Sequence, residues 1–377
     1  MKIFITIISL SFLLLTGSCI SKFMPETSEN MSMIVVDGLI TDQPEADTIK
    51  LYNSIPLGDK DRIIPVRGCT VLIEDDFGNV FYLTEISGGK YITDPEEFRG
   101  VVGMKYTLTI FTNSPSEFNY SYQSYPMEMK PVPPIDELYY EKTIVREPAE
   151  GVSLAEGCEI FLNTHDEAND CKFYKWEYKE TWQIHLPFDI INKTCWVSNN
   201  SDNIAVKNAT LLTENRIVKH PLLSISNETD RLAIRYSLLV NQYSLNEEEY
   251  NYWSKLKEAT ENVGSLYDIT PSSIIGNMFC VEDPNQIVLG YFSVSAKSSK
   301  RLFIKDNFAG IVNKLPDCID YETTTLRQLP GLNTLIWNII FCGLCIPPYF
   351  AYTYDKSCAD CTVRGANIKP DYWDETE

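Results

Sequence analysis

Two Cys-x-x-Cys pairs near the C-terminus are the residues whose type and spacing most directly indicate chemistry. They are Cys342 with Cys345 and Cys358 with Cys361. Four thiolates at this spacing are similar to those of a zinc ribbon, which holds its metal tetrahedrally. In an oxidising compartment the same cysteines form disulfides, so the location of the protein decides between these interpretations.

The N-terminus indicates an exported lipoprotein. A short cationic start, Met1-Lys2, precedes an apolar stretch at 3–15 that is too short to span a bilayer, and small residues then lead to Cys19. This arrangement predicts a lipoprotein signal peptide at 1–18, lipidation of Cys19 and a polar tether at 19–32. Thr16 stands where such signals usually have Leu. Ordinary cleavage, with Cys19 as a structural cysteine, is the alternative.

Export favours disulfides over zinc. The chain has 11 cysteines, so ten remain if Cys19 carries lipid. An even number in an exported protein predicts a disulfide framework, although the sequence cannot choose its pairings. Zinc held by the four C-terminal cysteines, and thioredoxin-like exchange, remain the alternatives, and we expect no cofactor. The disulfide candidates are Cys69, Cys158, Cys171, Cys195, Cys280, Cys318, Cys342, Cys345, Cys358 and Cys361.

The charge balance excludes one class of partner. Across 377 residues, 32 Lys and Arg oppose 52 Asp and Glu, which gives a formal charge of −20. A nucleic-acid-binding surface needs a basic patch to displace counterions, so nucleic acid is not an expected partner. A hydrophobic content of 44% is typical of a globular chain that can bury a core.

Motifs for catalysis are absent from the sequence. It has no nucleophile elbow, zinc-protease helix, phosphate loop or dinucleotide fingerprint. The three histidines, His165, His185 and His220, are isolated from any metal-ligand spacing. A non-catalytic protein is therefore the simpler expectation, while a hydrolase whose active site assembles from distant residues is an alternative.

Residues 33–130 predict an immunoglobulin-like antiparallel β-sandwich. Short apolar runs at 34–40, 48–52, 69–74 and 80–86 are separated by turn residues such as Gly78-Asn79. The run at 105–110 alternates polar and apolar residues, which places Tyr106, Leu108 and Ile110 on one buried face.

A proline cluster at 131–134 predicts a stiff connector to a larger, β-rich second domain at 131–377. Its strands are expected at 158–163, 171–186, 216–225, 232–239, 287–295 and 301–304. One amphipathic helix is expected after a capping box of Ser244 and Glu247, closing near Gly264. The run 335–346 is too short for a membrane span and predicts a buried strand or core segment.

The segment 172–186 carries a long alternating aromatic row. One face holds Tyr174, Trp176, Tyr178, Trp182, Ile184 and Leu186. Such a row can bind sugars or peptides, but it more often forms one wall of a sandwich core, which is the favoured interpretation.

The chain resembles the domain of unknown function 4249 family. The resemblance is carried by the lipoprotein-type start, the opening strand at 35–42, the connector at 131–140, the segment at 289–295, and the C-terminal stretches 358–361 and 367–373. It implies an outer-membrane lipoprotein of the Bacteroidota type, often encoded beside TonB-dependent receptors, and thus a helper of uptake. No binding residue is carried over.

These observations predict a mainly β, non-catalytic protein that is lipid-anchored to the outer membrane and assists a TonB-dependent receptor. Residues 20–23 lack an early acidic cluster, so periplasmic and surface-facing orientations both stay open. A structural or adhesive surface lipoprotein is the alternative, followed by the hydrolase.

Overall fold

The computed structural model describes residues 33–54, 64–113, 119–186, 192–261, 274–311, 322–325, 335–339, 350–355 and 360–374. The predicted signal peptide, Cys19 and tether lie outside the described residues. Four of the ten disulfide candidates, Cys318, Cys342, Cys345 and Cys358, also lie outside the described residues.

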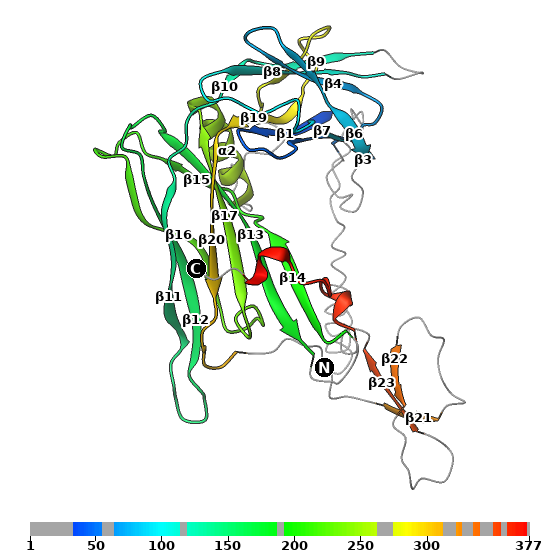
Figure 1. Ribbon diagram of the computed structural model, residues 1–377, viewed down its shortest axis with the longest axis vertical. Coiled ribbons are helices and arrows are strands. Elements are labelled where there is room, and N and C mark those ends of the chain that lie inside the picture. Colours follow the sequence, from blue (N-terminus) through cyan, green and yellow to red (C-terminus); the bar gives the residue numbers. More distant parts are fainter. Residues whose placement is uncertain are drawn as a thin grey trace, which may run out of the picture.

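The fold is mainly β, as the sequence predicts, and the described residues contain one α-helix. Figure 1 shows two β-rich units stacked along the long axis, with the first unit at the top. Each unit has its own hydrophobic core between facing sheets. The helix lies beside the junction of the two units (Figure 1).

The first unit is a sandwich of two six-stranded sheets. The first sheet has the order β19-β1-β2-β7-β6, with β3 against β2; its strands are β1 Ile34–Thr41, β2 Thr48–Asn53, β3 Ile64–Pro65, β6 Thr84–Ser87, β7 Lys90–Ile92 and β19 Leu289–Ser295. The second has the order β18-β9-β8-β4-β5, with β10 against β8; its strands are β4 Thr70–Asp75, β5 Val80–Tyr82, β8 Lys105–Phe111, β9 Ser121–Ser124, β10 Met127–Glu128 and β18 Met278–Cys280.

The alternating pattern of β8 is confirmed. Tyr106, Leu108 and Ile110 are all buried in the core of the first unit. The single run predicted at 80–86 is two strands, because the chain leaves the second sheet after β5 and enters the first at β6.

Two strands of the first sandwich come from far along the chain, which corrects the predicted boundary at residue 130. β19 pairs in parallel with β1, and β18 pairs antiparallel with β9. The predicted unit 33–130 therefore lacks one edge strand of each sheet, and the run at 287–295 was assigned to the wrong unit. The parallel β1–β19 pair is also a departure from a purely antiparallel sandwich. Periodicity identifies a strand but does not identify its partner.

The second unit contains a three-stranded and a five-stranded sheet. The first has the order β11-β12-β16, with β11 Ile135–Arg146, β12 Ala155–His165 and β16 Arg216–Ile225. The other has the order β14-β13-β17-β20, with β15 against β13; its strands are β13 Phe173–His185, β14 Thr194–Asn200, β15 Ala205–Asn208, β17 Tyr236–Leu245 and β20 Lys297–Ile304. A small separate sheet has the order β21-β23-β22, with β21 Glu322–Thr325, β22 Leu335–Ile339 and β23 Phe350–Asp355.

The aromatic row of β13 forms a wall of the second core, as expected. Tyr174 and Trp176 are 0% and 1% exposed, and all six residues of the row belong to this core. The C-terminal segment packs at the opposite face, where the Tyr372 hydroxyl lies 3.0 Å from the hydroxyl of Thr181. This segment contains two 3₁₀-helices, η2 Cys361–Val363 and η3 Asp371–Asp374. The row is thus structural and is not an exposed platform.

The helix α2, Glu247–Glu261, begins after a different cap from the one predicted. The Asn246 side chain accepts a hydrogen bond from the backbone N–H of Glu249 at 3.0 Å. Ser244 belongs to β17, and its hydroxyl donates to the carbonyl of Lys130. Asn is as good an N-cap as Ser, so the local pattern alone did not choose between them.

Candidate functional site

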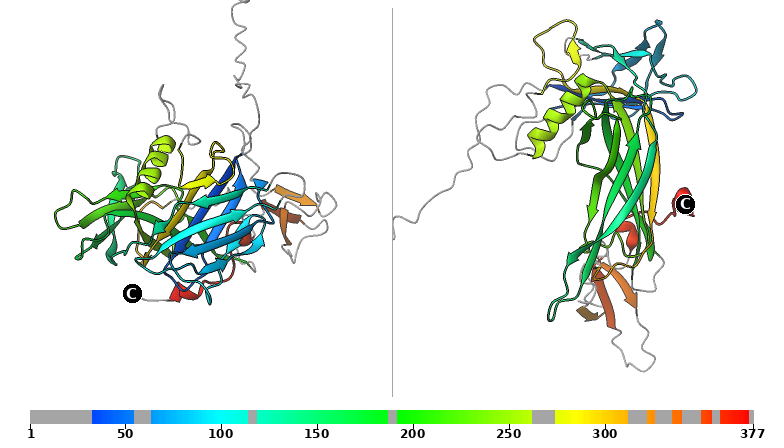
Figure 2. Two further views of the ribbon diagram at one scale, coloured as in Figure 1. Left: turned by 90° about the horizontal axis from the view of Figure 1, so that it is seen from above. Right: turned by 90° about the vertical axis from the view of Figure 1, so that its left-hand side faces the viewer.

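A polar cavity of about 330 Å³ lies where the two units meet. The first unit contributes β1, β2 and the loop between them, and the second contributes β13, β17 and the start of β20. Residues from β19 and the first turns of α2 complete the lining. Figure 2 shows α2 beside this junction. The volume is at the lower end of the range of small-molecule pockets.

The β1–β2 loop holds a buried carboxyl at the cavity. Asp47 accepts hydrogen bonds from the backbone N–H and the hydroxyl of Thr41, both at 3.0 Å. Its own backbone N–H donates to the hydroxyl of Thr93 at 2.9 Å. These contacts fix the loop and leave Asp47 6% exposed. Burial raises the pKa of Asp47 to about 7, against the lowering effect of the Thr41 hydrogen bonds.

The helix α2 places a second buried carboxyl in the cavity wall. Glu249 is 0% exposed, and its Oε1 accepts a hydrogen bond from the Trp253 indole N–H at 3.2 Å. The two residues are one turn apart, so their side chains meet on one helix face. Burial raises the pKa of Glu249 to about 7, although Ser293, Lys175 and Trp253 favour the ionised form.

Three lysines line the same cavity, and each forms an ion pair. Lys50 pairs with Asp37 and Lys175 pairs with Glu177, each at 2.8 Å. Lys297 pairs with Glu45 of the β1–β2 loop. Lys175 also lies over the Trp253 ring, with its Nζ 3.8 Å from the centroid. The last two pairs lie deeper, because Lys175 and Lys297 have only 13% and 15% of their side chains exposed.

The two units are joined directly at this cavity. The backbone N–H of Lys297 donates to Asp42 at 2.9 Å, and the Gln43 side-chain amide donates to the carbonyl of Lys297 at 3.0 Å. The strand β19 leads into β20 through Ala296 alone. The cavity therefore has walls that are held in place from both units.

The structure pairs two of the predicted disulfide candidates. Cys195 of β14 and Cys361 of η2 form a disulfide across 166 residues, which fastens the C-terminal segment to β14. Cys361 is therefore not available to the four-thiolate zinc arrangement, and the other three cysteines of that alternative lie outside the described residues. A backbone bridge between Trp196 and Ala366 lies beside the disulfide.

The other four described cysteines are not brought together. Cys69, Cys158, Cys171 and Cys280 are free thiols, and all but Cys69 are buried. Burial raises the pKa of both Cys158 and Cys171 to about 12, which leaves these thiols unreactive. The sequence predicted these four residues as disulfide candidates, whereas in the structure they are free thiols. The number of cysteines and the compartment of the protein do not indicate which side chains meet in the fold.

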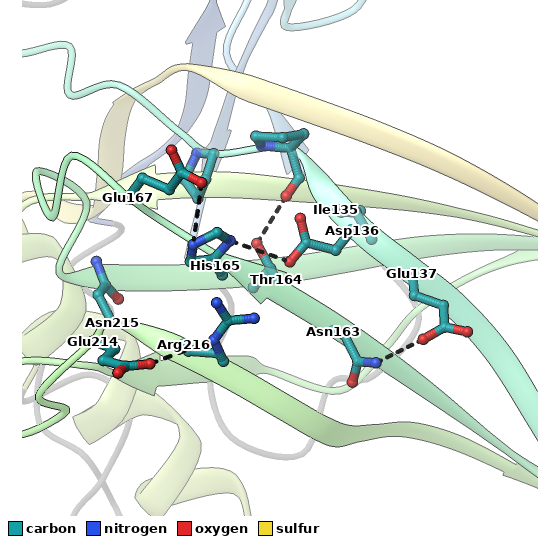
Figure 3. Close-up of polar contacts among 12 residues, drawn as sticks. Ile135, Asp136, Glu137, Asn163, Thr164, His165, Glu167, Glu214, Asn215 and Arg216 are labelled. Atoms are coloured by element: carbon teal, nitrogen blue, oxygen red, sulfur yellow. Dashed lines mark hydrogen bonds and ion pairs between the residues drawn. The ribbon is translucent and has the colours of Figure 1, made fainter.

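A second, open hollow lies along β11, β12 and β16 of the second unit, and Figure 3 shows its polar contacts. His165 lies 3.8 Å from Asp136 and 3.8 Å from Glu167. Among the described residues, no serine or threonine hydroxyl makes a hydrogen bond to His165; the adjacent Thr164 hydroxyl instead donates to the carbonyl of Pro134 at 2.9 Å. This arrangement lacks the nucleophile contact that a hydrolase triad requires.

The remaining histidines have structural environments. The His220 ring packs against Trp176 with centroids 4.3 Å apart, and burial lowers its pKa to about 4. His185 lies at an exposed strand end, with its Nδ1 3.0 Å from the Thr194 hydroxyl. The part of the chain that the structure describes contains no group of three or more His, Cys, Asp or Glu side chains placed to hold a metal.

None of the charged residues that line the junction cavity was identified from the sequence as a candidate functional residue. Glu249 was one of the acidic residues expected in the first helical turn, where such residues stabilise the helix dipole. Asp47 and Lys297 are 250 residues apart and belong to no motif. The only sequence signal is that Glu249 and Trp253 occupy one helix face with the expected apolar residues.

A comparison with models of protein families identifies the family to which the chain belongs. The model of the domain of unknown function DUF4249 matches residues 20–301. The chain belongs to this family. The matched range of this DUF4249 protein contains the first β-unit, the second β-unit up to the middle of β20, and every residue of the junction cavity, and it ends before Cys361. Among curated proteins, no significant match is found.

Among the described residues, no helix is long and apolar enough to cross a membrane.

Proposed function

We propose that the protein is a non-catalytic, lipid-anchored outer-membrane protein that captures a small ligand for a TonB-dependent receptor in nutrient uptake. The junction cavity is the observation that carries this proposal, because it is a polar pocket of ligand size with walls from two units. The lipoprotein-type N-terminus ending at Cys19 supports the anchor. Membership of the DUF4249 family supports the receptor partner, through the genomic neighbourhood that the resemblance implies.

The lipid anchor and the partner can be tested in one preparation. The mature protein is purified from the outer membrane after crosslinking, and its mass and its bound proteins are determined. We expect acyl chains on Cys19 and co-purification of a large β-barrel receptor. The Cys19→Ser variant is the control, because it should lose both the acyl mass and the receptor. A wild-type mass without lipid would contradict the anchor, and a repeated absence of the barrel would contradict the partnership.

A second candidate function is that of a structural or adhesive surface lipoprotein. The stacking of two β-units along one axis, seen in Figure 1, is suited to a spacer. Deletion of the gene distinguishes the two functions. Loss of growth on a limiting nutrient supports ligand capture, whereas altered attachment with unchanged uptake supports the spacer.

A further inference from the structure

The charges of the junction cavity do not balance. Five carboxyl groups and three lysines line it. Each lysine has its own carboxylate partner, in Asp37, Glu177 and Glu45. Two carboxyls, those of Asp47 and Glu249, therefore remain without an ion pair among the described residues. A buried carboxyl without a cation is costly, so a cavity that keeps two of them has a preference for positive charge.

Two buried oxygen atoms of the cavity residues also have no hydrogen-bond partner. They are the Glu249 Oε2 and the Ser295 Oγ, and both residues are 0% exposed. Nearly all buried polar atoms in proteins are satisfied, so unpaired oxygens beside a cavity indicate missing donors. Glu249 belongs to α2 and Ser295 to β19, so the two oxygens come from different elements that line the same cavity.

We propose that the junction cavity binds the primary ammonium group of a small ligand, with the Glu249 carboxylate and the Ser295 hydroxyl accepting its N–H donors. The proposal rests on the proposed function, since it names the chemical class of the ligand captured in the same cavity. The α-ammonium of an amino acid or short peptide and the end of a small diamine share this chemistry. A cavity of about 330 Å³ suits molecules of this size.

The surroundings favour an organic cation over the other ligand classes. A metal would need a cluster of ligating side chains, and the described residues contain none of three or more. An anion would have to displace a carboxylate from Lys175 or Lys297, whose side chains are largely buried in their pairs. A neutral ligand would leave the two carboxyls uncompensated.

Binding of an ammonium group depends on the ionisation of Glu249. The groups that act on this carboxyl are Ser293 of β19, Lys175 and Glu177 of β13, and Trp253 of α2 itself. Tyr291 of β19 also faces it, and the negative charge of Glu249 helps to raise the pKa of that phenol. With a pKa of about 7, Glu249 is mostly protonated at pH 5.5 and mostly ionised at pH 8. The affinity for an amine should therefore increase with pH over this interval.

The test uses the full mature protein in detergent and isothermal titration calorimetry at pH 8. The probes are glycylglycine and 1,4-diaminobutane, and N-acetylglycylglycine is the control that lacks the ammonium group. We expect at least one amine to bind, with affinity about tenfold or more above that of the acetylated control. Binding of glycylglycine alone would identify a peptide or amino-acid amine, and binding of the diamine alone would identify a polyamine; either supports the proposal.

Matched variants locate the site. Glu249→Gln keeps the shape and the Trp253 contact but removes the negative charge, so amine affinity should fall about tenfold. Glu247→Gln makes the same change at an exposed position of the same helical turn and should bind like the wild type. If Glu249→Gln does not fold, Ser295→Ala provides a second test, because it removes the hydroxyl proposed to accept an N–H donor and should also lower the affinity for the amine. Equal binding of the acetylated control, unchanged affinity in both cavity variants, or no binding of either amine would overturn the inference. Receptor co-purification tests the proposed function independently of these outcomes.

Discussion

Burial of Glu249 and Asp47 makes these two carboxyls unusual among the charged residues of an acidic chain. Glu249 is 0% and Asp47 is 6% exposed, whereas Glu247 and Glu248 on the same helix face solvent. A buried carboxyl without a cationic partner destabilises the folded state in its ionised form. Such a cost at a cavity is typical of a binding site, where a ligand supplies the missing interaction.

This cost predicts how stability changes with pH. The pKa of Glu249 is about 7 in the folded protein and near 4.5 when the chain is unfolded. Between these values the folded state binds more protons, so the free energy of unfolding should fall as the pH rises from 4.5 to 7, and it stays low above that range. The contribution is on the order of 3 kcal/mol. Urea unfolding of the wild type at pH 5 and pH 8 measures this difference.

The variant Glu249→Gln isolates the effect, because it removes the titrating group and keeps the size of the side chain. The variant should lose about 3 kcal/mol of the pH dependence, while the exposed control Glu247→Gln should retain the wild-type profile. Asp47 contributes a change in the same direction, since burial also raises its pKa to about 7. An identical slope in Glu249→Gln and wild type would show that Glu249 does not titrate in this interval.

Residues of the core were predictable from the sequence, and those of the cavity were not. The row from Tyr174 to Leu186 alternates with period two, which identifies a buried strand face whatever its partner is. Glu249 meets Lys175 and Ser293 only through tertiary contacts between separate elements. A carboxyl in the first turn of a helix is normally solvated, so its type and position gave no reason to expect burial.

At the scale of elements, the close approach of β19 to β1 depends on Gly290. This residue has φ +88°, and an added Cβ would lie 1.9 Å from the carbonyl oxygen of Val36. An L side chain is strained at this φ, and here it would also collide with the backbone of the neighbouring strand. Gly290 is thus required for the parallel pairing that attaches the late strand to the first sandwich.

The variant Gly290→Ala should therefore destabilise the protein by about 3 kcal/mol or more. Gly103 provides a matched control, because its φ is +89° and an added Cβ would meet nothing within 4 Å. Gly103→Ala should cost only the backbone strain, about 1–2 kcal/mol. Urea unfolding measures both values. Equal losses in the two variants would mean that the contact with Val36 relaxes without cost.

The strands themselves were largely predicted, and their pairing was not. The run at 287–295 was expected as a strand and forms β19, but it joins the first unit instead of the second. The cap of α2 was displaced from Ser244 to Asn246 because β17 extends to Leu245. In both cases a tertiary interaction overrides a local pattern that was compatible with more than one structure.

At the scale of the whole molecule, the chain leaves the first sandwich after β10, forms most of the second unit, and returns for β18 and β19. The returning segment brings Phe292 and Val294 into the core of the first unit, where they are 0% and 1% exposed. It continues through Ala296 into β20 of the second unit. Because one segment serves both units, the junction and its cavity form only when both units are folded.

The residues 33–130 are therefore predicted not to fold alone, although the sequence suggested an independent domain. Without β19, the strand β1 loses its parallel partner, and Val36 and Ile40, both buried in the intact core, lose part of their cover. The same fragment joined by a flexible linker to residues 274–296 regains both missing strands and should fold cooperatively. Amide dispersion in NMR spectra and thermal unfolding compare the two. A dispersed spectrum and a cooperative transition for 33–130 by itself would show that the first unit does not need the returning strands. The units would then be able to form separately, and the cavity would be an interface made after each had folded.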